Sequence, residues 1–150
     1  MDPMATGLRY RLRRASRQIA VQHQNMRELA RELEQALGEK RMDDLKDVLL
    51  RFRAAMDAHF ALEDGVFFPA LHGLHPEQRG ELEDLSHQHQ SFGVEIERVS
   101  QRLEESSLER FETAFHELLS GLASHEKREE SLVRAVADSF APSDREEAGE

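Results

Sequence analysis

Residues 58–64 (AHFALED) and 124–130 (SHEKREE) each place a histidine four residues before a glutamate: His59 before Glu63, and His125 before Glu129. Both segments lie in stretches with helical periodicity. Residues four apart on an α-helix lie on the same face, roughly 6 Å apart along its axis. An imidazole and a carboxylate placed side by side suit an iron, manganese or zinc ion. Two such pairs on two helices indicate a dinuclear metal site.

Apolar residues recur at steps of three and four along four segments, which predicts amphipathic helices over residues 7–38, 42–71, 76–105 and 107–138. Each apolar stripe is interrupted near its middle by one histidine: His23, His59, His89 or His125. In the second helix the predicted stripe reads Leu45, Leu49, Phe52, Met56, His59, Glu63, Val66 and Ala70. The stripe residues nearest the histidines are the expected apolar walls of the site: Ile19, Met26, Phe52, Met56, Val66, Leu85, Phe92, Leu122 and Leu132.

The links between these helices are short and contain turn residues: Gly38–Arg41, Gly73–His75 ahead of Pro76, and Glu105–Ser107. Short links make consecutive helices antiparallel, so the chain is predicted to be all-α, an up-down-up-down four-helix bundle. The middles of the helices then lie at one level, where four histidines and two glutamates converge. Buried carboxylates without a compensating cation are costly, so this convergence favours a bound metal over a satisfied core.

Two neighbouring residues compete for ligand positions. His89 lies in register with the apolar stripe of the third helix, whereas His87 lies roughly 200° away around the helix and pairs with Glu83, four residues earlier. We expect His89 at the site and keep the Glu83/His87 pair as the alternative. On the fourth helix, Glu130 directly follows Glu129 and is the alternative carboxylate. The remaining histidines, which lie off the stripes, are expected at the surface: His72, His75 and His116.

The 150-residue chain fits one domain, expected over 10–138 between a flexible N-terminus (1–9) and a disordered acidic tail (139–150). It contains no cysteine, which excludes disulfides, thiolate zinc sites and iron–sulfur clusters. The formal net charge of −10 argues against nucleic acid as a partner. No stretch approaches the ~20 apolar residues of a membrane span, and the arginine-rich N-terminus lacks the apolar region of an export signal. We therefore expect a cytoplasmic protein with no membrane partner.

In type, order and spacing, these residues resemble a hemerythrin-like (HHE-type) domain over about residues 10–137. The resemblance is carried, in chain order, by His23, His59, Glu63, Phe68-Pro69, His89, His125 and Glu129. It implies a four-helix bundle with a non-haem di-iron centre, with a mixed or other divalent metal pair as the alternative. By position, His23 and His59 would bind one iron. His89 and His125 would bind the other, and the two glutamates would bridge them.

The sequence departs from the oxygen-carrying members of that family at two places. They have two histidines four apart on the third helix, whereas the position four before His89 is Leu85. They also place the last carboxylate five residues after its histidine, which here is Glu130; the repeat of the four-residue step favours Glu129. Each iron would then keep two imidazoles, two bridging carboxylates and exchangeable positions.

Three functions are consistent with such a site. The first is a binding protein that takes up O2 reversibly, or that senses O2, NO or iron. The second is a di-iron peroxidase or catalase-like enzyme that acts on peroxide. The missing histidine at Leu85 favours the enzyme, whereas the lack of a tyrosine or an added basic residue on the inner stripes favours binding. The third is a docking bundle whose function needs no metal.

Overall fold

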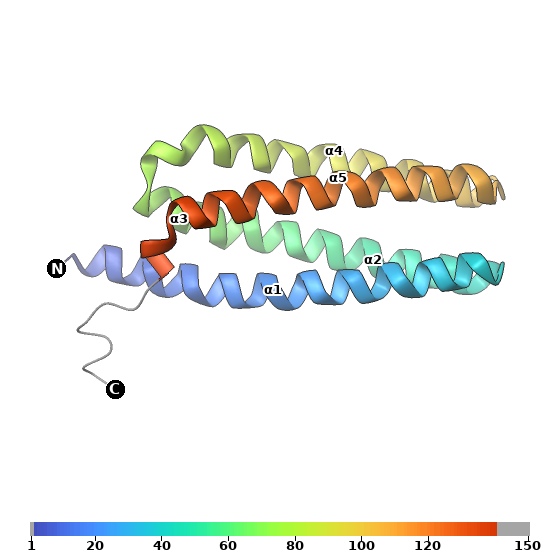
Figure 1. Ribbon diagram of the computed structural model, residues 1–150, viewed down its shortest axis with the longest axis horizontal. Coiled ribbons are helices and arrows are strands. Elements are labelled where there is room, and N and C mark those ends of the chain that lie inside the picture. Colours follow the sequence, from blue (N-terminus) through green and yellow to red (C-terminus); the bar gives the residue numbers. More distant parts are fainter. Residues whose placement is uncertain (1, 141–150) are drawn as a thin grey trace.

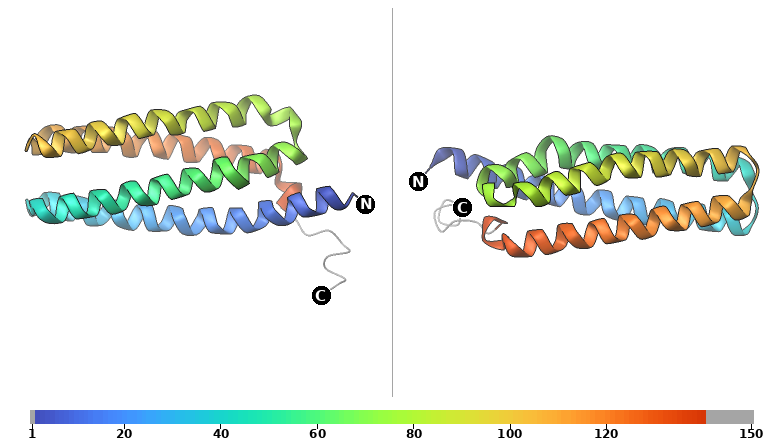
Figure 2. Two further views of the ribbon diagram at one scale, coloured as in Figure 1. Left: turned by 180° about the vertical axis from the view of Figure 1, so that it is seen from behind. Right: turned by 90° about the horizontal axis from the view of Figure 1, so that it is seen from above.

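The computed structural model describes residues 2–140, and the predicted acidic tail from Ala141 onward lies outside them. Four long helices run side by side (Figure 1). One hairpin consists of α1 (Pro3–Gly38) and α2 (Met42–Leu62), and the other of α4 (Arg79–Glu104) and α5 (Leu108–Ala135). Both hairpins turn at the same end, and the short α3 (Phe68–Leu74) leads from one to the other at the opposite end (Figure 2). The predicted up-down-up-down four-helix bundle is confirmed.

The first helix begins earlier in the chain than predicted. The first helix begins at Pro3 rather than at residue 7, because the Asp2 side chain accepts a hydrogen bond of 3.0 Å from the Met4 N–H and caps it. The helix therefore takes in most of the segment expected to form a flexible N-terminus. The two hairpin links each pass through a left-handed residue that is not glycine, Lys40 at φ 55° and Ser106 at φ 58°.

The second predicted helix is not one continuous α-helix. After α2 the chain forms a π-turn, η1 (Glu63–Phe67), which the Phe68 N–H closes by bonding to the Glu63 carbonyl. Pro69 explains the break, because proline has no N–H and its ring collides with the carbonyl four residues earlier, that of Gly65. A π-turn adds one residue to the helical repeat and is frequent at functional sites. Here it begins at a predicted ligand.

The extra residue shifts the buried stripe by one position. Val66, predicted to line the site, is 38% exposed, so this prediction is wrong. Phe67 takes its place and is buried, and the stripe continues through Ala70 and Leu71. The prediction failed because it carried the spacing of an ordinary α-helix through the π-turn.

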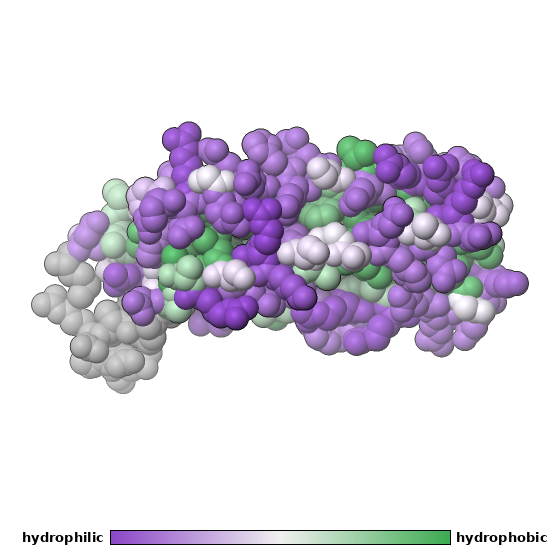
Figure 3. All heavy atoms as spheres, turned by 45° about the horizontal axis from the view of Figure 1, so that its top comes forward, coloured by the Kyte–Doolittle hydropathy of each residue, from purple (hydrophilic) through white to green (hydrophobic). Residues whose placement is uncertain are grey.

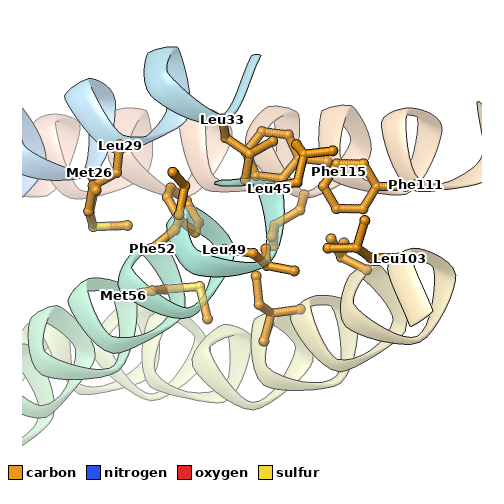
Figure 4. Packing of buried hydrophobic residues seen from close by; sticks show 14 of the residues in the cluster. Met26, Leu29, Leu33, Leu45, Leu49, Phe52, Met56, Leu103, Phe111 and Phe115 are labelled. Atoms are coloured by element: carbon orange, nitrogen blue, oxygen red, sulfur yellow. The ribbon is translucent and has the colours of Figure 1, made fainter. Parts of the chain in front are cut away.

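Two apolar clusters fill the bundle, one on each side of the histidines. The distal cluster lies toward the hairpin links and includes Phe52, Phe111 and Phe115, whose side chains point toward one another from α2 and α5 (Figure 4). The Phe52 and Phe115 rings meet edge to face with centroids 5.6 Å apart. The proximal cluster lies toward the other end and includes Leu12 and Leu85. The polar layer between the clusters is thus shielded along the bundle axis by packed apolar side chains.

The face of the bundle in Figure 3 is mostly hydrophilic, with apolar residues visible between the polar ones. Within residues 2–140, none of the helices is both long and apolar enough to cross a membrane.

Candidate metal centre

All six residues predicted to bind metal meet in the layer between the two clusters. Five of them are buried, and the His23 side chain is 18% exposed. One group of close nitrogen and oxygen atoms comprises Glu63, His89, His125 and Glu129, and a second comprises His23, His59 and Glu129. The structure therefore places the histidines in the two pairs expected from the sequence, with a glutamate common to both groups.

Within each pair the imidazoles face each other through Nε2. These atoms are 3.1 Å apart in His23 and His59, and 3.2 Å apart in His89 and His125. The Glu63 Oε1 atom lies between the pairs, 3.3 Å from the Nε2 atom of His59 and 3.1 Å from that of His89. Because it reaches a histidine of each pair, Glu63 occupies a bridging position.

The outer nitrogen of each ring fixes which way the inner one points. The Nδ1 atom of His59 lies 2.8 Å from the Gln22 amide oxygen, and that of His125 lies 2.6 Å from the Gln88 amide oxygen. Oxygens of this kind only accept, so Nδ1 carries the proton of each neutral ring and Nε2 keeps its lone pair toward the centre.

The other two rings have carboxylate partners. The Nδ1 atom of His89 lies 3.0 Å from both oxygens of Asp64, which also accepts a hydrogen bond of 2.8 Å from the Ser86 hydroxyl. The Nδ1 atom of His23 lies 3.2 Å from a Glu126 oxygen. Such outer partners raise the basicity of a ligating imidazole and hold its orientation. Each histidine pair has one amide-backed ring and one carboxylate-backed ring.

Aromatic side chains further restrain the rings. Phe60 stacks on His89 with centroids 4.0 Å apart and an interplanar angle of 11°, and Phe68 stacks on the same imidazole at 5.7 Å. Phe92 meets His125 edge to face, with centroids 5.4 Å apart. The inner nitrogens are thus preorganised before any ligand arrives.

The donor atoms fit a metal pair. Both oxygens of Glu63 and one of Glu129 are buried without a hydrogen-bond partner among the described residues, although the His125 Nε2 atom lies 2.7 Å from this Glu129 oxygen. Nitrogens 3.1–3.2 Å apart match neighbouring ligands on one ion, since imidazole–metal bonds of about 2.1 Å at a right angle place two nitrogens about 3.0 Å apart. Facing lone pairs and unpaired carboxylates both call for a cation.

The ionisation of these groups also suits metal uptake. Burial lowers the pKa of His59 to about 4 and raises that of Glu129 to about 9. Burial acts to lower the pKa of His125, but the Glu129 and Glu63 carboxylates outweigh it and raise that pKa to about 9. Burial acts to raise the pKa of Glu63, but its contacts with His125 and other imidazoles outweigh it and keep this carboxyl ionised. His125 and Glu129 lie 2.7 Å apart and at neutral pH hold a proton between them that a cation can displace.

The alternative residues lie outside the cluster. His87 and Glu83 are exposed on α4, and Glu130 is exposed on α5. Of the histidines expected at the surface, His72 and His116 are exposed, whereas His75 is half-buried.

Sequence reasoning missed the outer partners, which are Gln22, Asp64, Gln88 and Glu126. One signal was available, because the tripeptide Gln-His-Gln occurs at 22–24 and again at 88–90, around the ligand candidates of α1 and α4. In both copies the amide oxygen of the first glutamine lies in hydrogen-bond contact with the histidine of the following long helix. The two helical hairpins are therefore equivalent in this respect.

A four-helix bundle with a buried cluster of histidines and glutamates is typical of proteins that bind metal cations. The chain matches the family model of the hemerythrin HHE cation-binding domain over residues 14–137, and it belongs to that family. No curated protein and no solved structure matched the chain.

Proposed function

We propose that this chain is a non-haem di-iron protein that binds O2, either to store or to sense it, at the centre between the two apolar clusters. His23 and His59 would hold one iron, His89 and His125 the other, and Glu63 and Glu129 would bridge them. The observation that carries the proposal is the set of buried carboxylate oxygens without hydrogen-bond partners, facing four imidazole nitrogens. NO and iron itself remain the alternative ligands to be sensed.

When bound, a ferrous pair supplies the electrons and the open coordination positions that O2 needs. The protein supplies orientation, and its two apolar clusters keep water out along the bundle axis. The outer acceptors hold the Nε2 atoms toward the centre, while Phe60, Phe68 and Phe92 fix the ring planes. No tyrosine lies among the described residues of the centre to deliver a proton, because Tyr10 lies on an exposed face of α1. A centre without a phenol to donate a proton favours reversible binding over further reaction.

The test is elemental analysis followed by spectroscopy. Protein expressed in iron-supplemented medium should contain two irons per chain. After anaerobic reduction, exposure to air should change the near-ultraviolet and visible absorption, and argon should reverse the change. His59→Ala should lose iron and the optical change together, whereas the exposed His87→Ala should keep both. One iron, or none in correctly folded protein, would refute the di-iron proposal.

One observation favours a second function, turnover of peroxide. Leu85 stands where an oxygen carrier has a further histidine, and in the structure it is fully buried in the proximal cluster. One coordination position would then stay open to peroxide. Turnover above that of free iron, lost in His59→Ala, would support the enzyme. Turnover no faster than that of free iron would exclude the enzyme and leave O2 binding as the proposed function.

Chelation distinguishes a metal-binding protein from a docking bundle that needs no metal. If the bundle needs no metal, a chelator leaves its melting temperature unchanged. If ligands from four helices hold metal, removal of the metal lowers it, since binding to the folded state alone stabilises that state.

A further inference from the structure

A cavity of about 360 Å³ lies between α1 and α5 and leads to the metal centre. His23, His59 and His125 form its inner wall. The rest of its lining is mainly apolar and includes Met26, Phe52, Phe60 and Leu122. The centre is therefore open to this side of the bundle, in contrast to its closure along the bundle axis.

The cavity is much larger than O2 requires. A water molecule occupies about 30 Å³ of liquid, so the cavity corresponds to roughly a dozen waters, and a diatomic molecule needs about the space of one. Its size and apolar lining fall in the range of pockets that enclose small organic molecules. A ligand larger than O2 would fit between the solvent and the histidines.

The charges at the cavity favour an anion. Arg27 and Arg31 of α1 both line it. Arg27 is neutralised by Glu126, whose oxygen lies 2.6 Å away. The Arg31 side chain is exposed and has no hydrogen bond or ion pair to the described residues. It lies eight residues beyond His23, about 12 Å along the helix axis. The lining of the cavity thus extends along α1 from the metal centre to the Arg31 side chain.

The neighbouring cavity shows that this charge pattern is local. It has a volume of about 460 Å³ and lies on the other side of the His23–Glu126 contact. Three glutamates line it, Glu126, Glu129 and Glu130, against the single cation of Arg134. An anionic ligand is repelled there and attracted to the cavity with Arg31.

We propose that the cavity between α1 and α5 binds an organic monocarboxylate with an unbranched apolar chain. Its carboxylate pairs with Arg31, and its chain lies along Met26, Phe52 and Leu122 toward the histidines. The bound chain covers the solvent side of the centre and slows the entry of O2. This last effect rests on the proposed function, whereas the binding itself does not.

Isothermal titration with decanoate, kept below its micelle concentration, tests the binding on the full chain as purified with its metal. We expect saturable binding of one decanoate per chain. Arg31→Gln should weaken it about tenfold, which is the usual loss for a charge-assisted hydrogen bond. Arg17→Gln is the matched control, since Arg17 is also exposed on α1 but lines neither cavity. Uncharged 1-decanol should bind the parent about as weakly as decanoate binds Arg31→Gln.

A second variant fills the cavity. Ala123 lines it from an exposed position on α5, so Ala123→Phe should keep the helical circular dichroism and lose decanoate binding. The proposal is overturned if decanoate shows no saturable binding, if Arg31→Gln binds as tightly as Arg17→Gln, or if folded Ala123→Phe binds like the parent. Decanoate binding in a protein without any O2 response would refute the proposed function alone. An O2 response without decanoate binding would refute this inference alone.

Discussion

Replacing Glu63 with methionine should destabilise the metal-free protein and abolish its stabilisation by metal. Glu63 is fully buried, and its contacts with buried imidazoles keep its carboxyl ionised. Methionine has a similar length but no charge, so it leaves His125 without one of the carboxylates that raise its pKa. Removing one member of a buried charge pair costs about 3–5 kcal/mol. For a chain of this size, that lowers the melting temperature by about 6–20 °C.

Metal should raise the melting temperature of the parent protein. A ligand present at 1,000 times its dissociation constant stabilises the folded state by about 4 kcal/mol, or about 8–16 °C. Without Glu63, the two histidine pairs lose the oxygen that reaches both, so this increase should disappear. A variant that keeps the helical circular dichroism and unfolds cooperatively below the parent separates these two effects from a general loss of folding.

The assay is thermal unfolding followed by circular dichroism, with and without ferrous iron under anaerobic conditions. Glu130→Met is the control, because Glu130 is exposed beside the centre and should change neither melting temperature by more than a degree or two. The expectation fails if metal-free Glu63→Met melts at or above the parent, which would make the carboxylate a net destabilising part of the core. It is also refuted if the variant keeps the full response to iron.

Three further predictions follow from the same geometry. Asp64→Asn should weaken metal binding by about 10- to 100-fold in competition with a chelator, because it removes the charge behind His89, while the exposed Asp57→Asn should not. Metal uptake at pH 7 should release at least one proton, since the raised pKa values near 9 of His125 and Glu129 keep this contacting pair protonated until metal arrives. Affinity should therefore rise with pH up to about 9, and a dye titration without proton release would contradict this assignment. Phe115→Ala should cost about 3–5 kcal/mol in denaturant unfolding but leave the metal content unchanged, because its ring lies in the distal cluster.

The bundle could be predicted from the sequence because its helices obey one simple repeat. Apolar residues three and four apart define each buried face, and a histidine within the stripe must then point inward. His89 could be preferred over its neighbour His87 on this ground alone, and the structure buries His89 and exposes His87. Helix starts were harder to predict from the sequence, because the side chain of Asp2 caps the first helix and lets it begin at Pro3.

The outer partners could not be derived in the same way. A contact such as that of Gln22 with His59 joins two helices, and its geometry depends on their rotation and separation rather than on spacing along one of them. The repeated Gln-His-Gln was a pattern without an evident partner until the hairpins were assembled. The same holds for the cavity beside the centre, which depends on how far α1 and α5 stand apart.

The π-turn shows how one local break can serve the site. Pro69 removes a backbone donor just after the candidate bridging residue Glu63, and the chain accommodates this with a wider turn instead of a helix end. The turn contains Asp64, which reaches across to His89, and it exposes Val66 while burying Phe67. A continuous α-helix would follow the predicted stripe and turn Val66 inward. The break lies directly beside the centre, and the extra residue of the wider turn is the physical reason why pattern and structure disagree at this point and agree along the rest of α2.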